Sequence, residues 1–497
     1  MRRPARLALL AGAAVLAAPA QADTLREALA EAYRTNPTLQ SARAQQRATD
    51  EGVPIERSAG LPSVNATGVY TEFLQQSSTS FTSPERAVTA GIDLGVPLYS
   101  GGAVKNAVRA AKERVEAGRA DLRGTESAIF TQVVAAYMDV LRGQALVALS
   151  QNQVDVLAVN LEATSDRFEI GDLTRTDVAQ SQSRLAVAQG DLRSAQANLI
   201  AAREDYIALV GSAPGALEPP PPLPGLPDGT DTAVAIALEN NPDLIAAQER
   251  AEAAGYDINV AGAGRLPRVS AFAGYDYQNF LGTLPGSRID PDDPTGPVIG
   301  LPQTSTAAQA GIQISIPIFQ GGRPAALQRQ AQARASAALE TVIAAERDVI
   351  AQVRAAYSSW LAANAIIESS QTAVEAAELS LEGVRAENSI GNRTILDVLN
   401  AEQELLSARV QLVTARRNAY VAGFSLLAAM GRAEARDLGL DDEGLLYDPT
   451  LNYERVRNII WDWQRDPDPV PQSTRTVDIP APDASIPPHQ DDVTPSQ

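Results

Sequence analysis

Hydrophobic residues recur at every seventh position over two long stretches of the chain. Four such series run through five consecutive sevens each, beginning at Val133, Val178, Val353 and Val398. A seven-residue repeat sustained over this length is typical of coiled coils. It predicts opposed pairs of long helices, 102–170 with 172–210 and 323–390 with 392–430. The first would be about 103 Å long at 1.5 Å per residue, which argues against the alternative of ordinary amphipathic helices in a compact bundle.

Four shorter segments alternate between apolar and polar residues with a period of two. The alternation is clearest from Val88 to Leu98 and from Ala308 to Ile318. It predicts β-strands with one apolar and one polar face, and the full set is 63–73, 87–98, 268–278 and 307–318. Each strand has about the ten residues that a tilted strand needs to cross a bilayer. A soluble sandwich would alternate in the same way, but these strands form two isolated pairs separated by long helices.

Four strands are too few to close a barrel, because single-chain bacterial barrels begin at about eight. An open sheet in lipid would leave backbone groups unpaired at its edges, at a cost of several kcal/mol each. If the strands enter a membrane, several copies of the chain must therefore join to complete the wall.

The chain contains a near-copy of itself. Asn36-Pro37 recurs as Asn241-Pro242 after 205 positions, and Gly101-Gly102 recurs as Gly321-Gly322 after 220 positions. The repeat predicts two similar halves, 23–218 and 230–435, joined by a proline-rich linker at 219–229. Because the residue before proline resists the helical conformation, each Asn-Pro pair separates two shorter helices. These helices are predicted at 24–35 and 37–60, and at 231–240 and 242–265.

The two ends of the chain differ in character. Arg2, Arg3 and Arg6 precede an apolar stretch of about 14 residues and the pattern Ala20-Gln21-Ala22, which predicts a cleaved secretory signal over 1–22. That stretch is too short to span a bilayer, and no later segment is expected to form a membrane helix. The segment 436–464 carries a cluster of aromatic residues, and 465–497 is rich in proline and aspartate and is predicted to be disordered.

Composition excludes several kinds of chemistry. The chain has no cysteine, and its single histidine, His489, lies in the proline-rich tail. Disulfides, thiolate or histidine metal sites and Ser-His-Asp catalysis are therefore not expected, and we predict no cofactor, no metal and no enzymatic activity. The net charge of −19 disfavours nucleic acid as a partner. It suits a soluble wall or a lumen that favours cations.

Each long helix must reverse direction at a glycine. Phe168 and Gly171 mark the first reversal, and Asn388 and Gly391 mark the second. Glycine adopts the left-handed conformation that ends a helix. The patterns Thr174-x-x-Asp177 and Thr394-x-x-Asp397 then resemble the start signals of the returning helices. Two interpretations of the aspartates stay open: they stabilise the helix starts, which we favour, or they form acidic rings at the mouth of a pore.

Taken together, these features resemble the TolC family of outer-membrane efflux and secretion channels. The resemblance covers nearly all of 23–435 and rests on the repeat, the two Asn-Pro pairs, the Pro-x-x-x-Gly-Gly segments at 97–102 and 317–322, and the two Gly-x-x-x-x-x-Asp-Val tips. It implies an α+β membrane protein of the Gram-negative outer membrane that extends into the periplasm. Each copy would supply two repeats of two strands and long coiled-coil helices to a homotrimer. The trimer would enclose a 12-stranded β-barrel in outer-membrane lipid, continuous with a 12-helix α-barrel.

The resemblance also implies partners and site residues. The helical tips would dock to a periplasmic adaptor and an inner-membrane transporter of the ABC, RND or MFS type. Because no phosphate-binding loop is apparent, the duct itself would be passive. Docking would involve the tip residues Phe168, Gly171, Asn388 and Gly391. The gate would involve Thr176, Asp177, Arg393, Thr394 and Asp397. From their positions before the two aspartates, Arg175 and Arg393 offer salt bridges as one means of holding the mouth shut, and a solvated helix face is the default interpretation.

Two departures from the family pattern concern the mouth of the duct. Asn400 stands where some members have a second acid, and Asn388 where some have an aromatic residue. A double acidic ring that binds divalent cations is therefore not expected. An equatorial belt around the tunnel would hold Tyr447, Tyr453, Trp461 and Trp463. The alternative function is a periplasmic adaptor of the membrane-fusion type, which would have one hairpin flanked by soluble β-domains. The sequence does not name the cargo.

Overall fold

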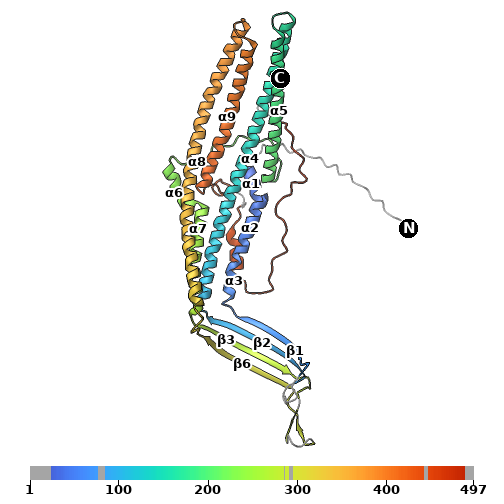
Figure 1. Cartoon of the computed structure of the whole chain (residues 1–497), viewed down its shortest axis with the longest axis vertical. Helices are drawn as coiled ribbons and strands as arrows, with labels where there is room; N and C mark the ends of the chain where they lie inside the picture. Colours follow the sequence, from blue (N-terminus) through green and yellow to red (C-terminus); the bar gives the residue numbers. More distant parts are fainter. Residues whose placement is uncertain (1–23, 76–83, 285, 290–294, 442–445, 487–497) are drawn as a thin grey trace, which may run out of the picture.

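A long pillar of helices joins a β-sheet at one end, as the computed structural model in Figure 1 shows. The structure describes residues 24–75, 84–284, 286–289, 295–441 and 446–486. The predicted signal at 1–22 lies outside these residues. The first repeat comprises α1 (Leu25–Thr35), α2 (Pro37–Asp50), α3 (Gly52–Ser58), β1 (Ser63–Glu72), β2 (Arg86–Tyr99), α4 (Ala103–Glu169) and α5 (Arg175–Val210).

The second repeat has the same order of elements. It comprises α6 (Thr230–Asn240), α7 (Pro242–Gly262), the 3-10 turn η1 (Ala263–Arg265), β3 (Arg268–Asn279), β6 (Thr304–Ser315), α8 (Arg323–Ser389) and α9 (Ile395–Ala429). The short strands β4 (Ser287–Arg288) and β5 (Val298–Ile299) pair between β3 and β6, and α10 (Pro449–Val456) follows the second repeat.

The single helix predicted over 37–60 is wrong. The structure ends α2 at Asp50 and begins α3 at Gly52. Gly52 and Pro54 supply the reason, because glycine weakens a helix and proline lacks the N–H that would bond to the carbonyl of Asp50. The corresponding helix of the second repeat, α7, runs unbroken for 21 residues. The other predicted helices begin and end within a few residues of the observed bounds.

One antiparallel sheet in the order β1-β2-β3-β6 combines the strands of both repeats. Residues directly opposite each other on neighbouring strands point to the same side. The register pairs Ala66 with Ile92, Ile92 with Tyr275, and Tyr275 with Ala308, and these residues therefore share one face. That face also carries Val64, Tyr70, Val88, Leu94, Val96, Val269, Ala271, Ala273, Ile312 and Ile314.

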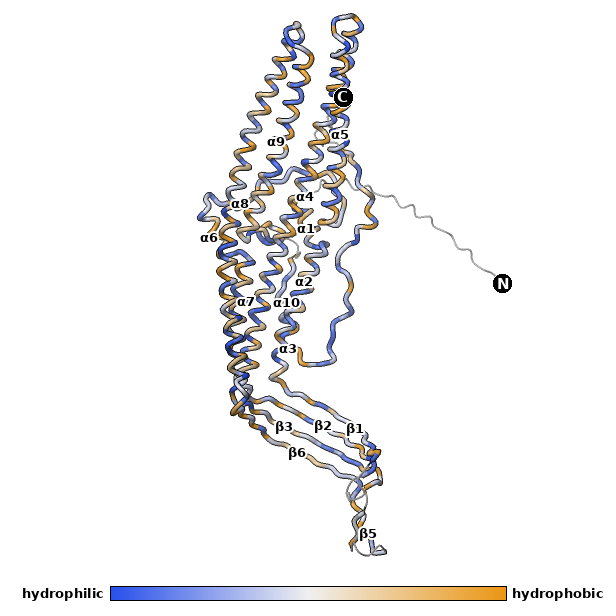
Figure 2. The backbone as a smooth tube through the Cα atoms, in the orientation of Figure 1, coloured by the Kyte–Doolittle hydropathy of each residue, from blue (hydrophilic) through white to orange (hydrophobic). Residues whose placement is uncertain are grey.

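The opposite face of the sheet is mainly polar. Apart from Val69, Phe272 and small side chains, it carries Asn65, Thr67, Thr71, Thr89, Asp93, Ser270, Asp276, Gln278, Ser305, Gln309 and Gln313. The colours in Figure 2 change repeatedly along each strand, as this alternation requires. The apolar face has no cover in the described chain, and Val64, Ile92 and Ile312 are all more than half exposed.

The seven-residue series lie along the packed faces of two helical hairpins, α4 with α5 and α8 with α9. Val133, Leu199, Val353 and Leu426 are buried completely or almost so. One finding differs from the expectation that no later segment resembles a membrane helix. By length and composition alone α4 contains a window apolar enough to span a bilayer, 44% of it buried in the structure. We interpret this helix as the core helix of the pillar, because α1, α5, α7 and α9 all pack on it.

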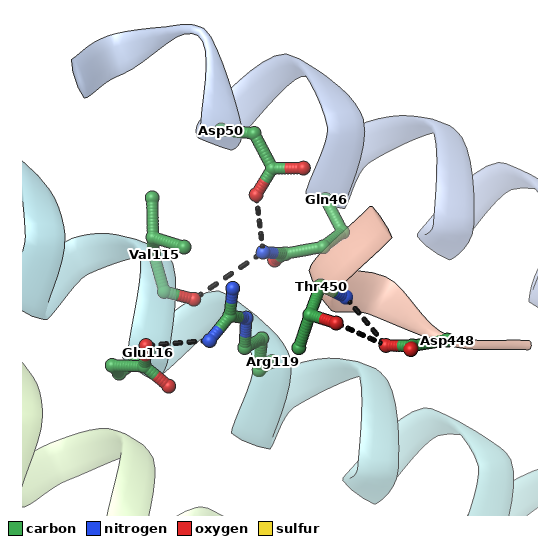
Figure 3. A network of polar contacts seen from close by, with 7 residues as sticks. All are labelled: Gln46, Asp50, Val115, Glu116, Arg119, Asp448 and Thr450. Carbon is green, nitrogen blue, oxygen red and sulfur yellow. Dashed lines mark hydrogen bonds and ion pairs between the residues drawn. The ribbon is translucent and has the colours of Figure 1, made fainter. Parts of the chain in front are cut away.

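A belt of polar contacts attaches α10 to the middle of the pillar. Figure 3 shows Gln46 donating to Asp50 and to the carbonyl of Val115, beside Arg119 and the start of α10. Asn452 of α10 donates to the other oxygen of Asp50 at 2.7 Å. Burial raises the pKa of Asp50, although these hydrogen bonds oppose the effect.

The aromatic cluster is only partly packed on this belt. Tyr447 and Tyr453 contact the core, and the ring of Tyr453 lies 5.3 Å from the guanidinium carbon of Arg119. Trp461 and Trp463 are 68% and 84% exposed, respectively, so the prediction that they are core anchors is wrong for the single chain. Both rings follow the end of α10 at Val456 and lie mostly in solvent in the described chain.

The tail differs from the predicted disorder as far as residue 486. Residues 465–486 form no helix or strand, but they follow a defined path beside α2 and α5 (Figure 1). Arg203 of α5 donates hydrogen bonds to Asp483 and Ser485. A buried guanidinium needs acceptors, and the tail provides them for both Nη atoms of Arg203. The remainder, 487–497, lies outside the described residues.

Candidate functional site

The two hairpin tips have nearly identical backbone structures. Gly171 and Gly391 follow the ends of α4 and α8 with φ angles of 85° and 81°, the left-handed conformation that side chains disfavour. Neither glycine has a neighbouring atom where a Cβ would lie, so conformation and not crowding requires glycine here. The predicted docking residue Phe168 is 42% exposed, and Ile170 and Ile390 beside the glycines are 81% and 71% exposed. The tips therefore present apolar side chains to solvent.

Asp177 and Asp397 both cap the helix that returns from a tip. Asp177 Oδ2 accepts from the backbone N–H of Thr174 at 2.9 Å and from its hydroxyl at 2.7 Å. Asp397 accepts from Thr394 in the same way, at 3.0 and 2.7 Å. The hydrogen bonds from the threonine side chains, followed by those from the backbone, lower the pKa of both aspartates. Both carboxylates therefore remain charged at neutral pH while acting as caps.

The other predicted gate residues make local contacts. Arg393 Nε lies 2.7 Å from Glu387 Oε2 in the same hairpin, and this hydrogen bond raises the pKa of Arg393. Asn388 donates to the carbonyl of Arg393 at 2.8 Å, so both residues stabilise the turn between α8 and α9. Thr176 is exposed on the first turn of α5. Within the described chain, none of these contacts links one tip to the other.

The link between the hairpins lies further from the tips, on a seam where α9 packs against α4. Glu402 of α9 is buried, and its two oxygens lie 2.9 and 3.0 Å from the amide nitrogen of Asn160 on α4. Arg385 of α8 also donates to Glu402, at 3.0 Å. A buried carboxylate is tolerated only when hydrogen-bonded and paired in this way. Glu402 therefore joins hairpin two (α8 with α9) to hairpin one (α4 with α5).

Two further contacts follow the same seam. Arg184 of α5 donates to Asn400 of α9 at 2.8 Å. At mid-height, Arg417 of α9 binds both oxygens of Asp139 of α4, at 3.1 and 2.6 Å. Figure 1 shows the two hairpins as separate ribbons that run side by side from mid-height to their tips. Movement of one tip relative to the other must therefore strain or break these contacts.

Sequence reasoning missed the seam. Glu402 lies four residues after Val398 and next to Ala401, so it flanks the buried stripe of Val398, Ala401 and Leu405. Charged residues are common at such flanking positions of a coiled coil, and the position therefore gives no signal of a buried acid. It does not identify Asn160, 242 positions away, as its partner.

Comparison with known proteins agrees with this architecture. The family model described as outer membrane efflux protein matches residues 11–212 and 233–432. The chain is 33% identical over 460 residues to the outer membrane efflux protein BepC of Brucella suis biovar 1 (strain 1330), covering 93% of this chain and 96% of BepC. It is 25% identical over 447 residues to the outer membrane protein TolC of Escherichia coli (strain K12), covering 88% of each.

A solved structure shares the fold. The crystal structure of the outer membrane protein VceC from Vibrio cholerae superposes with a TM-score of 0.68 at 24% identity, covering 82% of this chain and 96% of VceC. Both repeats, the four-stranded sheet and the paired hairpins thus occur in a chain whose two halves each match the family. The chain therefore belongs to the outer membrane efflux protein family, which consists of channel proteins, and not to the coiled-coil adaptors considered as the alternative.

Proposed function

We propose that three copies of this chain form a passive duct through the outer membrane and the periplasm. The observation that carries this proposal is the four-stranded sheet, which has one exposed apolar face and two edges, β1 and β6, without partner strands in the described chain. In lipid such edges must be paired, and β1 of one copy can pair with β6 of the next. Three copies would supply about twelve strands, an even number within the range of membrane barrels.

The two faces of the sheet support the same arrangement. The apolar face would contact lipid and the polar face would line a water-filled lumen, as in other membrane barrels. The paired hairpins would continue the wall below the membrane as a ring of helices. Their exposed apolar tips suit docking to a periplasmic adaptor and, through it, to an inner-membrane transporter of the ABC, RND or MFS type. That transporter would supply the energy and select the cargo.

We also propose that the tips form the closable mouth of the duct. Thr176 and Asp177 would line it from hairpin one, and Arg393, Thr394 and Asp397 from hairpin two. Support comes from their position at the reversal of each hairpin and from the charge that the capped aspartates retain. Three copies would repeat each carboxylate around the axis, which would favour cations at the entrance.

A pair of lysine substitutions on neighbouring residues tests the sheet. Ile92 is 55% exposed on the apolar face in the middle of β2, and Asp93 points to the polar face. We expect Ile92→Lys to reduce the amount of trimer recovered from the outer-membrane fraction, because a lysine facing lipid at mid-depth costs about 2–4 kcal/mol. Asp93→Lys should assemble normally, since its side chain would face water. Equal recovery of the two variants would contradict the proposed orientation.

The mass of the detergent-extracted particle tests the number of subunits. Crosslinking of the purified protein should give trimers and no larger closed species. A pore-forming particle with the mass of one subunit would show that the proposed closure of the sheet is wrong.

A further inference from the structure

We propose that residues 465–486, here called the strap, are a fixed part of the fold that lies at the boundary between subunits. In this proposal the strap binds α5 of its own chain and contacts α8 of the next copy. The second part rests on the proposed trimer. The first part concerns contacts within one chain and stands independently of it.

An ion pair near the start of the strap attaches it to α10. Both oxygens of Asp466 accept hydrogen bonds from Arg455 of α10, at 2.8 Å each. The pKa of Asp466 is lowered, chiefly by this hydrogen bond from Arg455. From there the strap follows the flank of the pillar past α2 toward α5 (Figure 1). Its lower end is thus attached to a helix that is itself held by Asp50.

In its middle the strap meets the end of α5. Gly211 ends this helix with a φ angle of 87°, and a Cβ added there would lie 2.8 Å from the hydroxyl oxygen of Thr474. The backbone therefore approaches the strap more closely than a side chain at this position would permit. Residues 474–477 also line a cavity of about 520 Å³ together with Asn36 and Leu209. The strap and the junction of α1 with α2 enclose the end of α5 from two sides.

Arg203 is the anchor at the upper end. Its side chain is only 8% exposed, although α5 lies at the edge of the pillar. Its Nη2 donates to the carbonyl of Ser485 at 2.6 Å, and Nη1 donates to the carbonyl and to the carboxylate of Asp483. Burying a guanidinium costs several kcal/mol unless its donors are satisfied. In the described chain the strap supplies acceptors to Nη1 and Nη2, whereas Nε is buried without a hydrogen-bond partner. The burial of Arg203 and the docking of the strap therefore depend on each other.

The edge that the strap covers is the one that faces a neighbour in a closed ring. At the level of the hairpins, α5 packs on α4 at one side of the pillar, and α8 packs on α9 at the other. When copies join side by side, the α5 edge of one therefore meets α8 of the next. The strap lies on that edge and must take part in the contact or be displaced by it.

The exposed side of α8 complements the strap. Ile343, Leu361 and Leu379 are exposed at intervals of 18 residues, or about five helical turns, so they lie on one face of α8, about 27 Å apart. Arg347 and Arg354 are also exposed within this stretch. The strap offers the opposite charge through Asp468 and Asp478, whereas Asp466 and Asp483 are bonded within the chain to Arg455 and Arg203. Apolar residues flanked by arginine are the composition expected of a surface that meets a protein partner.

The strap of one copy and the exposed residues of α8 in the next copy also lie at similar heights along the pillar. A Cβ at Gly143 would touch Leu199 at 3.1 Å, which places these two residues at one level. The internal repeat relates position 143 of α4 to position 363 of α8. Arg203 lies about one helical turn further from the tip than Leu199. It is therefore level with residues near 359 of α8 in the next copy, between Arg354 and Leu361. The strap below Arg203 passes the level of Arg347.

A spin label tests the docking of the strap. The chain has no cysteine, so a nitroxide on Ala484→Cys would be the only label. We expect an immobilised spectrum with Arg203 in place and a mobile one after Arg203→Ala. Arg193→Ala, which removes an exposed arginine of the same helix, is the matched control and should leave the label immobilised. A label that is already mobile with Arg203 in place would overturn the proposal.

Dissociation of the trimer tests the boundary. In a detergent heating series, Arg203→Ala and a chain ending at Gln464 should both dissociate at a lower temperature than the unaltered protein, and Arg193→Ala should not. If the shortened chain dissociates at the unaltered temperature, the strap is not part of the boundary even where the label shows that it docks. An unaltered protein that is monomeric would instead refute the proposed trimer, while the label would still decide whether the strap binds α5.

Discussion

Replacing Glu402 with alanine should loosen hairpin two from hairpin one. The side chain of Glu402 is 2% exposed and accepts from Asn160 and Arg385. Hydrogen bonds to a charged group contribute about 1.5–3 kcal/mol each. After the substitution Arg385, whose side chain is 52% exposed, can be rehydrated, whereas Asn160 is left half-buried. We therefore expect a loss of about 2–4 kcal/mol in the free energy of unfolding, at or below the usual cost of breaking a buried ion pair.

A double-mutant cycle with Asn160→Ala isolates the contact between the hairpins. Denaturant unfolding, followed by the helical circular dichroism signal, should show a coupling energy of about 1–3 kcal/mol between the two substitutions. Glu402→Gln should cost less than Glu402→Ala, because its amide oxygen can still accept one hydrogen bond. In planar bilayers the Glu402→Ala channel should conduct more than the unaltered channel, since tip two is no longer held by the seam.

The matched control for this prediction is Glu378→Ala. It removes the ion pair of Glu378 with Arg409, which measures 2.7 Å and joins α8 to α9 within hairpin two. Both side chains are more than a third exposed, so this substitution should cost about 0.5 kcal/mol or less and leave conductance unchanged. If Glu402→Ala costs no more than the control, or if the two substitutions at the seam are simply additive, the reasoning about the seam is wrong.

Three further predictions concern the mouth of the duct and Glu126, a buried acid of α4 that accepts from the backbone N–H of Ala435. Burial raises the pKa of Glu126 to about 7, so the folded protein binds this proton more tightly than the unfolded chain, and stability should fall as pH rises from about 4.5 to about 7. Glu126→Gln should make the thermal unfolding temperature less dependent on pH over this range. Arg393→Ser should raise the conductance of the closed channel, because it removes the ion pair between Arg393 and Glu387 that stabilises the turn between α8 and α9. Asp397→Ala should also raise conductance if this carboxylate lines the mouth, and it should lower the melting temperature because it removes a cap.

Controls separate these effects. Thr394→Ala removes the same cap as Asp397→Ala but keeps the charge, so a rise in conductance in both variants would assign Asp397 to capping alone. A slope of unfolding temperature against pH that persists in Glu126→Gln would show that another group titrates. Unchanged conductance in both Arg393→Ser and Asp397→Ala would remove these residues from the gate.

Much of the local structure could be predicted because its causes lie within a few residues. The seven-residue series predicted four long helices, and the alternation predicted the two faces of each strand. Thr174 with Asp177, and Thr394 with Asp397, predicted helix starts that the structure shows as capping boxes. Even the break after Asp50 had a local cause in Gly52 and Pro54, and it was a signal that the sequence reasoning overlooked.

Contacts between distant segments could not be predicted in this way. The pairing of Glu402 with Asn160 depends on which helices are neighbours and on how each is rotated about its axis. The docking of Arg203 on Asp483 joins residues 280 positions apart, and composition alone made that tail look disordered. Trp461 and Trp463 show the converse, because an aromatic cluster predicts a packed core only where other elements come close enough to cover it.

By itself the sequence determined the repeat, the type of each element and the ends of the helices, since periodicity and capping act over one or two turns. Only the tertiary structure decided that β2 pairs with β3 and so merges the two repeats into one sheet, that the hairpins join at a buried glutamate away from their tips, and that the tail lies along α5. The physical reason is that burial and hydrogen-bond partners are set by the packing of whole elements, which the local pattern of residues does not specify.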